Sequence, residues 1–197
     1  MSVKPAVKAV RRRRTAEVAR AEALAEARNL LLTDGPQAVT LKAVAAPLGM
    51  SHVNLIHHFG SAEGLQAALM ESMAAELRVA LNHRDYEIRD MGSARRFIDL
   101  VFDAFDAGGA GKLTAWIALS QNTQIMARLV AIVAEVAHEM EDPCLPREVS
   151  SASFITVVSL ALADSLAGGV LSSALRLPAD NNRDLAARLM LDVLGRR

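Results

Sequence analysis

Residues 40–59 read TLKAVAAPLGMSHVNLIHHF, and this stretch decides the fold of the N-terminal part of the chain. Thr40 is placed to cap a short helix that ends at Gly49, and Ser51 to cap a second short helix that ends at Phe59. A glycine between two short helices supplies the left-handed turn of a helix-turn-helix. This motif presents its second helix to the major groove of DNA, although tight helical turns also occur in proteins that bind no DNA.

Helical patterns surround the motif on both sides. An alanine-rich helix is expected over residues 15–32, and Ser61 starts a long helix in which leucine or methionine recurs every four residues up to Leu81. Ser93 starts the next expected helix, which is broken at Gly108-Gly109. Further helices are expected at residues 111–121, 123–141, 147–175 and 181–195, so the chain is predicted to be all-α.

The composition supports a folded helical chain. Hydrophobic residues make up 52% and charged residues 22% of the 197 residues, which is enough apolar side chain for a core. Alanine, the strongest helix former, occurs 36 times. The single cysteine, Cys144, excludes an internal disulfide and a cysteine-based zinc site, so a reducing compartment is expected, with the cytoplasm as the default.

Charge is divided unevenly along a chain whose formal net charge is zero. Residues 1–60 carry nine lysines and arginines against four acids, a balance of +5, and residues 61–197 carry the opposite balance. A polyanion would therefore meet one end of the molecule. The run Arg11, Arg12, Arg13 and Arg14 is expected to form a flexible arm that contacts DNA, with an inert solvated tail as the alternative.

The sequence contains no motif for metal binding or catalysis. His57 and His58 are adjacent, so they point about 100° apart on a helix and do not share one ion as an i, i+4 pair does. His138 is not followed by the second histidine of a zinc-protease motif, and neither a phosphate-binding glycine loop nor a Gly-x-Ser-x-Gly elbow occurs. No enzyme activity, metal or cofactor is therefore expected.

Residues 149–175 are long and apolar enough to be considered as a membrane span. Asp164 near the centre of this stretch would cost about 2.5–3.5 kcal/mol in a bilayer. The stretch also holds eight serines and threonines and little leucine, isoleucine or phenylalanine to offset them. We therefore expect a helix buried in protein and no membrane partner.

From Ala21 to about Leu81 the chain resembles the N-terminal domain of the TetR family of bacterial transcriptional regulators. The matching pieces are Gly35, Val39-Thr40-Leu41, Val44-Ala45, Leu48-Gly49-Met50-Ser51, Leu55-Ile56-His57-His58-Phe59 and Gly60-Ser61-Ala62-Glu63-Gly64-Leu65. The resemblance implies a ligand-responsive DNA-binding regulator, in most cases a repressor. It divides the chain into a basic arm at residues 1–14, a three-helix DNA-binding domain at 15–60 and a helical ligand-binding and dimerisation domain at 61–197.

Three residues depart from the family pattern. Ile56 stands where the family usually has tyrosine and Ala62 where it usually has lysine, so two contacts to backbone phosphates are lost. Pro47 lies in the last turn of the second helix, where it removes a hydrogen bond to Ala43 and is expected to tighten or kink the turn. These departures keep an alternative open, a helical small-molecule-binding or interaction protein with weak DNA binding.

The motif spacing and the resemblance together assign the DNA contacts. Ser51, His52 and Asn54 lie in the first turn of the recognition helix and are expected to reach base edges, with Asn54 suited to adenine and His52 to guanine acceptors. Leu55 and Phe59 on the opposite face are expected in the core. The expected phosphate contacts are Thr40, Lys42, His57 and His58.

A two-fold homodimer is expected from the helices at residues 147–175 and 181–195. Small residues in the first of these helices allow another helix to approach closely. Such a dimer would place two recognition helices on a palindromic operator in double-stranded DNA. The expected interface residues are Ala163, Ala167, Gly168, Leu171 and Leu189.

The resemblance also implies a cavity for a small-molecule effector of unknown identity among the helices at residues 93–141. Methionine and aromatic side chains suit an apolar or aromatic ligand. Asp99, Asp103 and Asp106 form a neighbouring stripe, expected to be solvated, or to meet a cationic ligand if turned inward. The expected lining is Phe97, Phe102, Phe105, Trp116, Gln121 and Met126.

Overall fold

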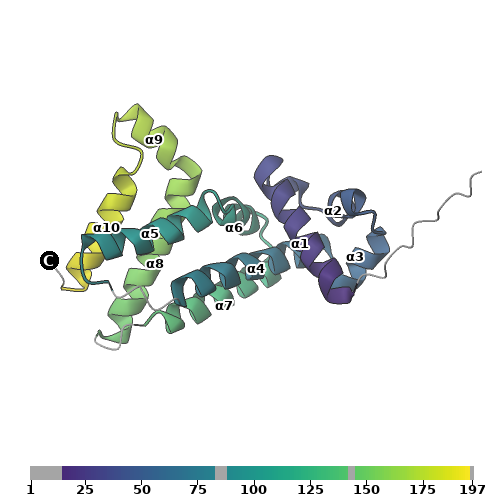
Figure 1. Cartoon of the computed structure of the whole chain (residues 1–197), viewed down its shortest axis with the longest axis horizontal. Helices are drawn as coiled ribbons and strands as arrows, with labels where there is room; N and C mark the ends of the chain where they lie inside the picture. The colour runs from purple at the N-terminus through teal and green to yellow at the C-terminus, as the bar shows by residue number, and fades with distance from the viewer. Residues whose placement is uncertain (1–14, 83–87, 142–144, 196–197) are drawn as a thin grey trace, which may run out of the picture.

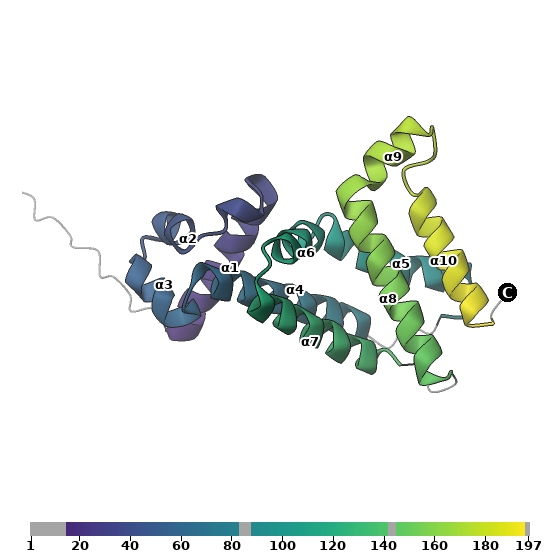
Figure 2. The same ribbon diagram turned by 180° about the vertical axis from the view of Figure 1, so that it is seen from behind.

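The computed structural model describes residues 15–82, 88–141 and 145–195. Within these residues the protein is helical throughout, which confirms the predicted fold class. Figure 1 shows α1, α2 and α3 at one end of an elongated molecule, and α5, α8 and α10 at the other. Between them run α4 and α7, side by side in both Figure 1 and Figure 2.

The N-terminal helices begin and end within a residue or two of the predicted positions. They are α1 (Ala16–Thr33), α2 (Leu41–Leu48) and α3 (His52–Phe59), with a 3-10 turn η1 (Pro36–Ala38) between α1 and α2. α2 continues through Pro47 and ends at Gly49, whose φ of 61° only glycine adopts readily. Pro47 has no N–H to donate, and it lies in the last turn of α2. That turn is held instead by the Gly49 N–H, which donates to the carbonyl oxygens of Ala45 and Ala46.

The remaining helices form the larger part of the molecule. They are α4 (Ala62–Asn82), α5 (Met91–Phe105), α6 (Ala110–Leu119), α7 (Thr123–Glu139), α8 (Arg147–Ala163), α9 (Gly169–Ala174) and α10 (Asn181–Val193). A π-helical turn, η2 (Asp164–Gly168), joins α8 directly to α9, so the single helix expected over residues 147–175 is present with one wide turn inside it.

The start of α5 differs from the sequence-based expectation. Asp90, and not Ser93, is the N-cap: its carboxylate accepts the Ser93 backbone N–H at 2.7 Å, and the Ser93 hydroxyl accepts the Asp90 N–H at 3.0 Å. This reciprocal pair satisfies two backbone N–H groups at once, which a serine cap alone does not. The hydrogen bond from the Ser93 backbone also lowers the pKa of Asp90.

Two groups of buried side chains form the core. The first joins α1, α2 and α3 to α4 and α6 through fully buried residues such as Leu31, Leu55, Leu65 and Leu113. The second joins α5 to α8 and α10 around Phe97, Phe102 and Ala187. The DNA-binding helices therefore share a continuous core with the helices that follow them.

One helical stretch, Arg147–Ala174, is long and apolar enough to cross a membrane, with a mean hydropathy of 1.9 in its most apolar window. Only 17% of that window is buried inside the chain. The sequence-based expectation of a helix buried in protein is therefore not met within one copy. Exposed apolar surface of this kind is typical of a site that contacts another molecule.

Candidate nucleic-acid interface and effector cavity

α3 is held against α1 at its C-terminal end. Arg20 on α1 donates from Nη1 to the carbonyl oxygen of His58 at 3.0 Å, and its guanidinium carbon lies 4.8 Å from the centre of the Phe59 ring. Both contacts suit a cation, because a helix C-terminus and the face of an aromatic ring each carry partial negative charge. Leu55 and Phe59 are buried beside Arg20, so the opposite face of α3 is presented to solvent.

Arg20 is a positioning residue that sequence reasoning did not identify. Its hydrogen-bond partner is a backbone carbonyl 38 residues along the chain, and no side-chain pattern reports such a contact.

The two predicted caps are formed. The Thr40 hydroxyl oxygen accepts the Ala43 N–H at 3.2 Å, and the Ser51 hydroxyl oxygen accepts the Asn54 N–H at 3.1 Å. Each hydroxyl keeps its hydrogen for a further acceptor such as a phosphate or a base. Thr40 and Ser51 thus both shape the motif and remain available at its exposed surface.

The exposed surface of α3 carries most of the predicted DNA contacts. His52, Asn54 and His57 are exposed, His58 is half-buried, and Lys42 is exposed on α2. Val53, which the sequence analysis does not name among the DNA contacts, is 60% exposed between His52 and Asn54. Its position on the face of α3 opposite the buried Leu55 is the sequence feature that predicts this exposure.

The positive charge of the N-terminal part lies almost entirely outside the described residues. Residues 15–60 hold three cations and four acids, a balance of −1, so residues 1–14 contribute +6 to the +5 of residues 1–60. Arg20 is engaged with α3, and Arg28 forms an ion pair with Glu76 on α4. Residues 1–14, which include Arg11–Arg14, therefore carry most of the positive charge with which this part of the chain would attract phosphates.

Replacing Asn54 by alanine is expected to reduce discrimination between operator and random DNA by about 1–3 kcal/mol, because an asparagine makes a two-point contact with adenine. Lys42→Ala is the matched control: it should weaken both DNAs equally and lower the salt slope by about one. Competition gel shifts at several salt concentrations measure both quantities. Equal losses on the two DNAs for Asn54→Ala would contradict the assignment.

A largely apolar cavity of about 490 Å³ lies between α4, α5, α7 and α8. This volume is within the range of about 300–1,000 Å³ that small-molecule sites occupy. Its few polar groups are Thr114 on α6, Asp103 on α5 and the pair formed by Arg28 and Glu76. The apolar lining includes Met73, Leu77, Phe105, Leu129, Phe154 and Val158.

Of the six residues expected to line an effector cavity, Phe105 lines this one and the other five lie elsewhere. Phe97 and Phe102 are buried in the second core group together with residues of α8 and α10, and the guanidinium of Arg183 on α10 lies over the Phe102 ring. Trp116 and Gln121 lie at the surface, and Met126 packs against the first core group. Met70, Met73 and Phe154, outside the range 93–141, take their place.

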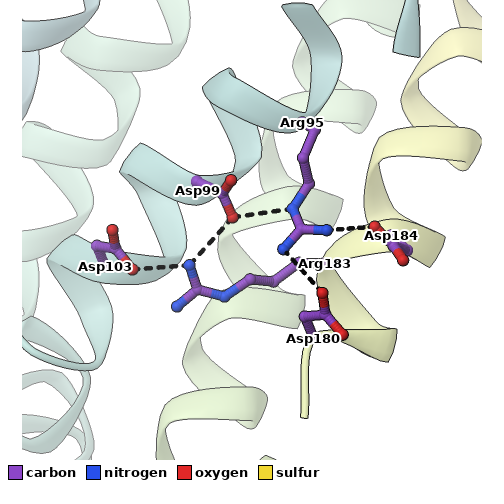
Figure 3. A network of polar contacts seen from close by, with 6 residues as sticks. All are labelled: Arg95, Asp99, Asp103, Asp180, Arg183 and Asp184. Atoms are coloured by element: carbon purple, nitrogen blue, oxygen red, sulfur yellow. Dashed lines mark hydrogen bonds and ion pairs between the residues drawn. The ribbon is translucent and has the colours of Figure 1, made fainter. Parts of the chain in front are cut away.

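The acidic stripe of α5, Asp99, Asp103 and Asp106, is not fully solvated, and only Asp103 lines the cavity. Figure 3 shows Asp99 between two arginines, with Arg95 Nε at 2.9 Å and Arg183 Nη1 at 3.1 Å. Arg183 also reaches Asp103 at 2.7 Å, and Arg95 pairs with Asp180 and Asp184. This network ties α5 to α10.

A second, open hollow of about 570 Å³ lies beside the network. Asp106 and Asp164 are among the residues that line it, and Asn182 donates to Asp164 at 2.6 Å. Arg95, Asp180 and Arg183, which also line it, belong to the ion-pair network, and Asp164 accepts from Asn182, so most of its charged side chains are already engaged.

The expected dimer residues lie on α8, α9 and α10. Ala163, Ala167, Leu171 and Leu189 are exposed. Gly168 differs from this expectation, because it is buried inside its own chain, where an added Cβ would collide with the Asp164 carboxylate. Large apolar side chains continue the exposed surface, namely Leu166, Val170, Leu175, Leu185 and Val193.

Within the described ranges, no group of three or more histidine, cysteine or acidic side chains is arranged to hold a metal ion. His57 and His58 belong to the DNA-facing helix, as described above.

Comparison with known proteins identifies the N-terminal part. Residues 23–69 match the model of the bacterial regulatory proteins of the tetR family. This match covers α2, α3 and parts of α1 and α4. A search of curated proteins finds no match.

Solved structures share the fold of the whole chain. The fatty acid degradation regulator FadR of Bacillus halodurans has a TM-score of 0.64 at 11% identity, over 90% of this chain and 97% of its own. A TetR-family regulator of Mesorhizobium loti has a TM-score of 0.61 at 15% identity, over 91% and 98%. One from Pectobacterium atrosepticum has a TM-score of 0.58 at 18% identity, over 92% and 95%.

Proposed function

We propose that this chain is a dimeric repressor of the TetR family of bacterial transcriptional regulators and that it releases a palindromic operator when a small molecule fills its cavity. It would act in the cytoplasm on double-stranded DNA and needs no catalytic group or cofactor for this role. The neighbouring solved structures support the fold alone, so the proposal rests on the geometry of this chain.

The proposal is supported mainly by the fact that the cavity is lined by residues of both the N-terminal helices and the larger helical part. Arg28 belongs to α1 of the DNA-binding part, yet it lines the cavity beside its partner Glu76 on α4. A molecule in the cavity would therefore contact an ion pair that joins the DNA-binding helices to the rest of the chain. Its binding energy can then depend on the position of α1, which is the requirement for regulation.

α6 supplies a second connection between the two parts. Its residues Ala110 and Thr114 line the cavity. Gly109 at its start lies so close to α1 that an added Cβ would be 3.1 Å from Leu31 Cδ2. Gly111 lies against Ser165 in η2. A ligand that displaced α6 would thus push on α1 and on the helix that carries the proposed dimer surface.

The proposed dimer covers the apolar surface of α8, α9 and α10. Leu171 is 58% exposed and Val170 is 75% exposed in the single chain, which is costly unless a partner covers them. A second copy related by two-fold symmetry presents the same residues. The two recognition helices would then contact half-sites about 34–36 Å apart, or somewhat further.

The ligand class follows from the lining. Apolar side chains dominate it, and its acids are paired, Glu76 with Arg28 and Asp103 with Arg183. A mostly apolar small molecule therefore fits better than a highly charged one.

Filling the cavity tests the proposal. Ala74 on α4 lines the cavity, whereas the adjacent Ala75 is exposed. Ala74→Phe is expected to make operator affinity independent of any effector found by a thermal-shift screen, because the new ring occupies the ligand's space. Ala75→Phe should respond like the natural protein. Gel shifts with and without effector measure this, and a full response in Ala74→Phe would refute the assignment of the cavity.

The alternative function, a small-molecule-binding or interaction protein with weak DNA binding, is favoured by two observations. Ile56 and Ala62 lack the polar groups that would reach phosphates, and residues 15–60 carry no net positive charge. A gel shift against the intergenic DNA upstream of the protein's own coding sequence separates the two functions. No shift at micromolar protein and low salt would favour the alternative.

A further inference from the structure

The recognition helix exposes two apolar side chains on the surface that would meet DNA. Val53 is 60% exposed and Ile56 is 40% exposed, whereas Leu55 and Phe59 on the same helix are buried. Residues three apart on a helix lie about 60° apart around the axis and about 4.5 Å along it, so Val53 and Ile56 are neighbours. They form a small apolar patch on an otherwise polar surface.

The same helix carries no lysine or arginine. Its eight residues are HVNLIHHF, so the two-point contact of a guanidinium or ammonium group with guanine is not available from α3. Asn54 offers its amide to adenine. Base recognition by α3 therefore depends on hydrogen bonds from Asn54 and His52 and on whatever Val53 contacts.

The major groove offers one apolar feature at a base edge, the methyl group on C5 of thymine. We propose that Val53, with Ile56 beside it, contacts this C5-methyl group, so that it selects a thymine next to the adenine that Asn54 reads. This inference rests on the proposed DNA-binding function and adds the base that the apolar patch recognises. Val53 lies in the first turn of α3, which is the part of a recognition helix that reaches base edges, and Ile56 follows in the next turn.

The methyl group can be removed from DNA without any other change, because uracil is thymine without its C5-methyl. The full-length protein first selects duplexes from a randomised pool. Each thymine of the selected duplex is then replaced singly by deoxyuridine. Affinity is expected to fall about fourfold at one thymine in each half-site, the value for one buried methyl-sized group, and to change little at the others.

Variants of Val53 connect this loss to the side chain. Val53→Ser removes both methyl groups at an exposed position, so it should bind thymine and uracil duplexes equally at the sensitive site. Val53→Thr keeps one methyl group and should retain most of the preference. Melting temperatures close to that of the natural protein show that both variants fold.

The methyl group can also come from 5-methylcytosine, and a separate arm distinguishes the two sources. With cytosine in place of the sensitive thymine, methylation of that cytosine should recover about fourfold in affinity through Val53, although the changed base pair keeps binding below that of thymine. A selected duplex that binds uracil and thymine equally well at every position overturns the inference and leaves the DNA-binding function intact. A pool that yields no enriched sequence overturns both.

Discussion

Ala167→Arg is expected to convert the protein into a monomer that no longer binds its operator. Ala167 is exposed in η2, between α8 and α9 and close to the exposed Val170 and Leu171, where the proposed two-fold interface brings two copies of one helix together. Each substituted copy would bury an unpaired guanidinium at a cost of about 3–5 kcal/mol. Two copies double this cost, which weakens dimerisation by more than about ten-thousandfold.

Loss of the dimer should also remove operator binding, because one chain then contacts one half-site only. Light scattering at micromolar concentration reports the mass, and a gel shift reports operator binding. Ala134→Arg is the matched control, since it adds the same charge at an exposed alanine on α7 and should remain a dimer. A dimeric Ala167→Arg variant that binds the operator normally would exclude this surface as the interface.

The N-terminal helices were predictable because their first residues are capped locally, whereas α6, α8 and α10 begin without a side-chain cap. Thr15, Thr40 and Ser51 act as caps through hydrogen bonds to the third residue after them, and such contacts depend only on spacing. The burial of Leu55 and Phe59 follows in the same way from helical periodicity. Even Asp90, the missed cap, sits three residues before the predicted Ser93.

The cavity was less predictable because it is assembled from distant helices. Phe97, Phe102 and Phe105 lie on one helix and look equivalent in sequence, yet only Phe105 lines the cavity. What separates them is the position of α10, which packs on α5 and is tied to it by Arg183. Contacts between residues about 80 positions apart leave no mark in periodicity.

The proposed DNA-facing surface was more predictable from the sequence than the cavity and less predictable than the N-terminal helices. Its residues lie on one short helix, so His52, Asn54 and His57 could be placed from sequence. The contact from Arg20 on α1 could not, although it holds the recognition helix in position. Val53 could not be singled out in the same way, because it carries no hydrogen-bonding group that would mark it as a base contact.

Gly111→Ala is expected to lower the free energy of unfolding by about 1–3 kcal/mol, the usual cost of adding a group to a packed site. A Cβ at this position would lie 2.0 Å from Ser165 Oγ and 2.9 Å from the Phe105 carbonyl oxygen, so α6 would have to move away from η2 and from the end of α5. Chemical denaturation measures the change. Because Ala110 beside it lines the cavity, the same displacement should also weaken effector binding.

Gly92→Ala is the matched control, since Gly92 is also helical but exposed, with its nearest neighbours at an ordinary 3.5 Å. There the methyl group should raise stability by up to about 1 kcal/mol, because alanine loses less backbone entropy than glycine in a helix. Removing the Ser165 side chain should partly rescue Gly111→Ala. The double variant Gly111→Ala/Ser165→Gly is expected to lose less unfolding free energy than the sum of the losses of the two single variants. If Gly111→Ala instead stabilised the protein as Gly92→Ala does, α6 would not be in close contact with η2, and it would lose its proposed role in linking the cavity to the dimer helix.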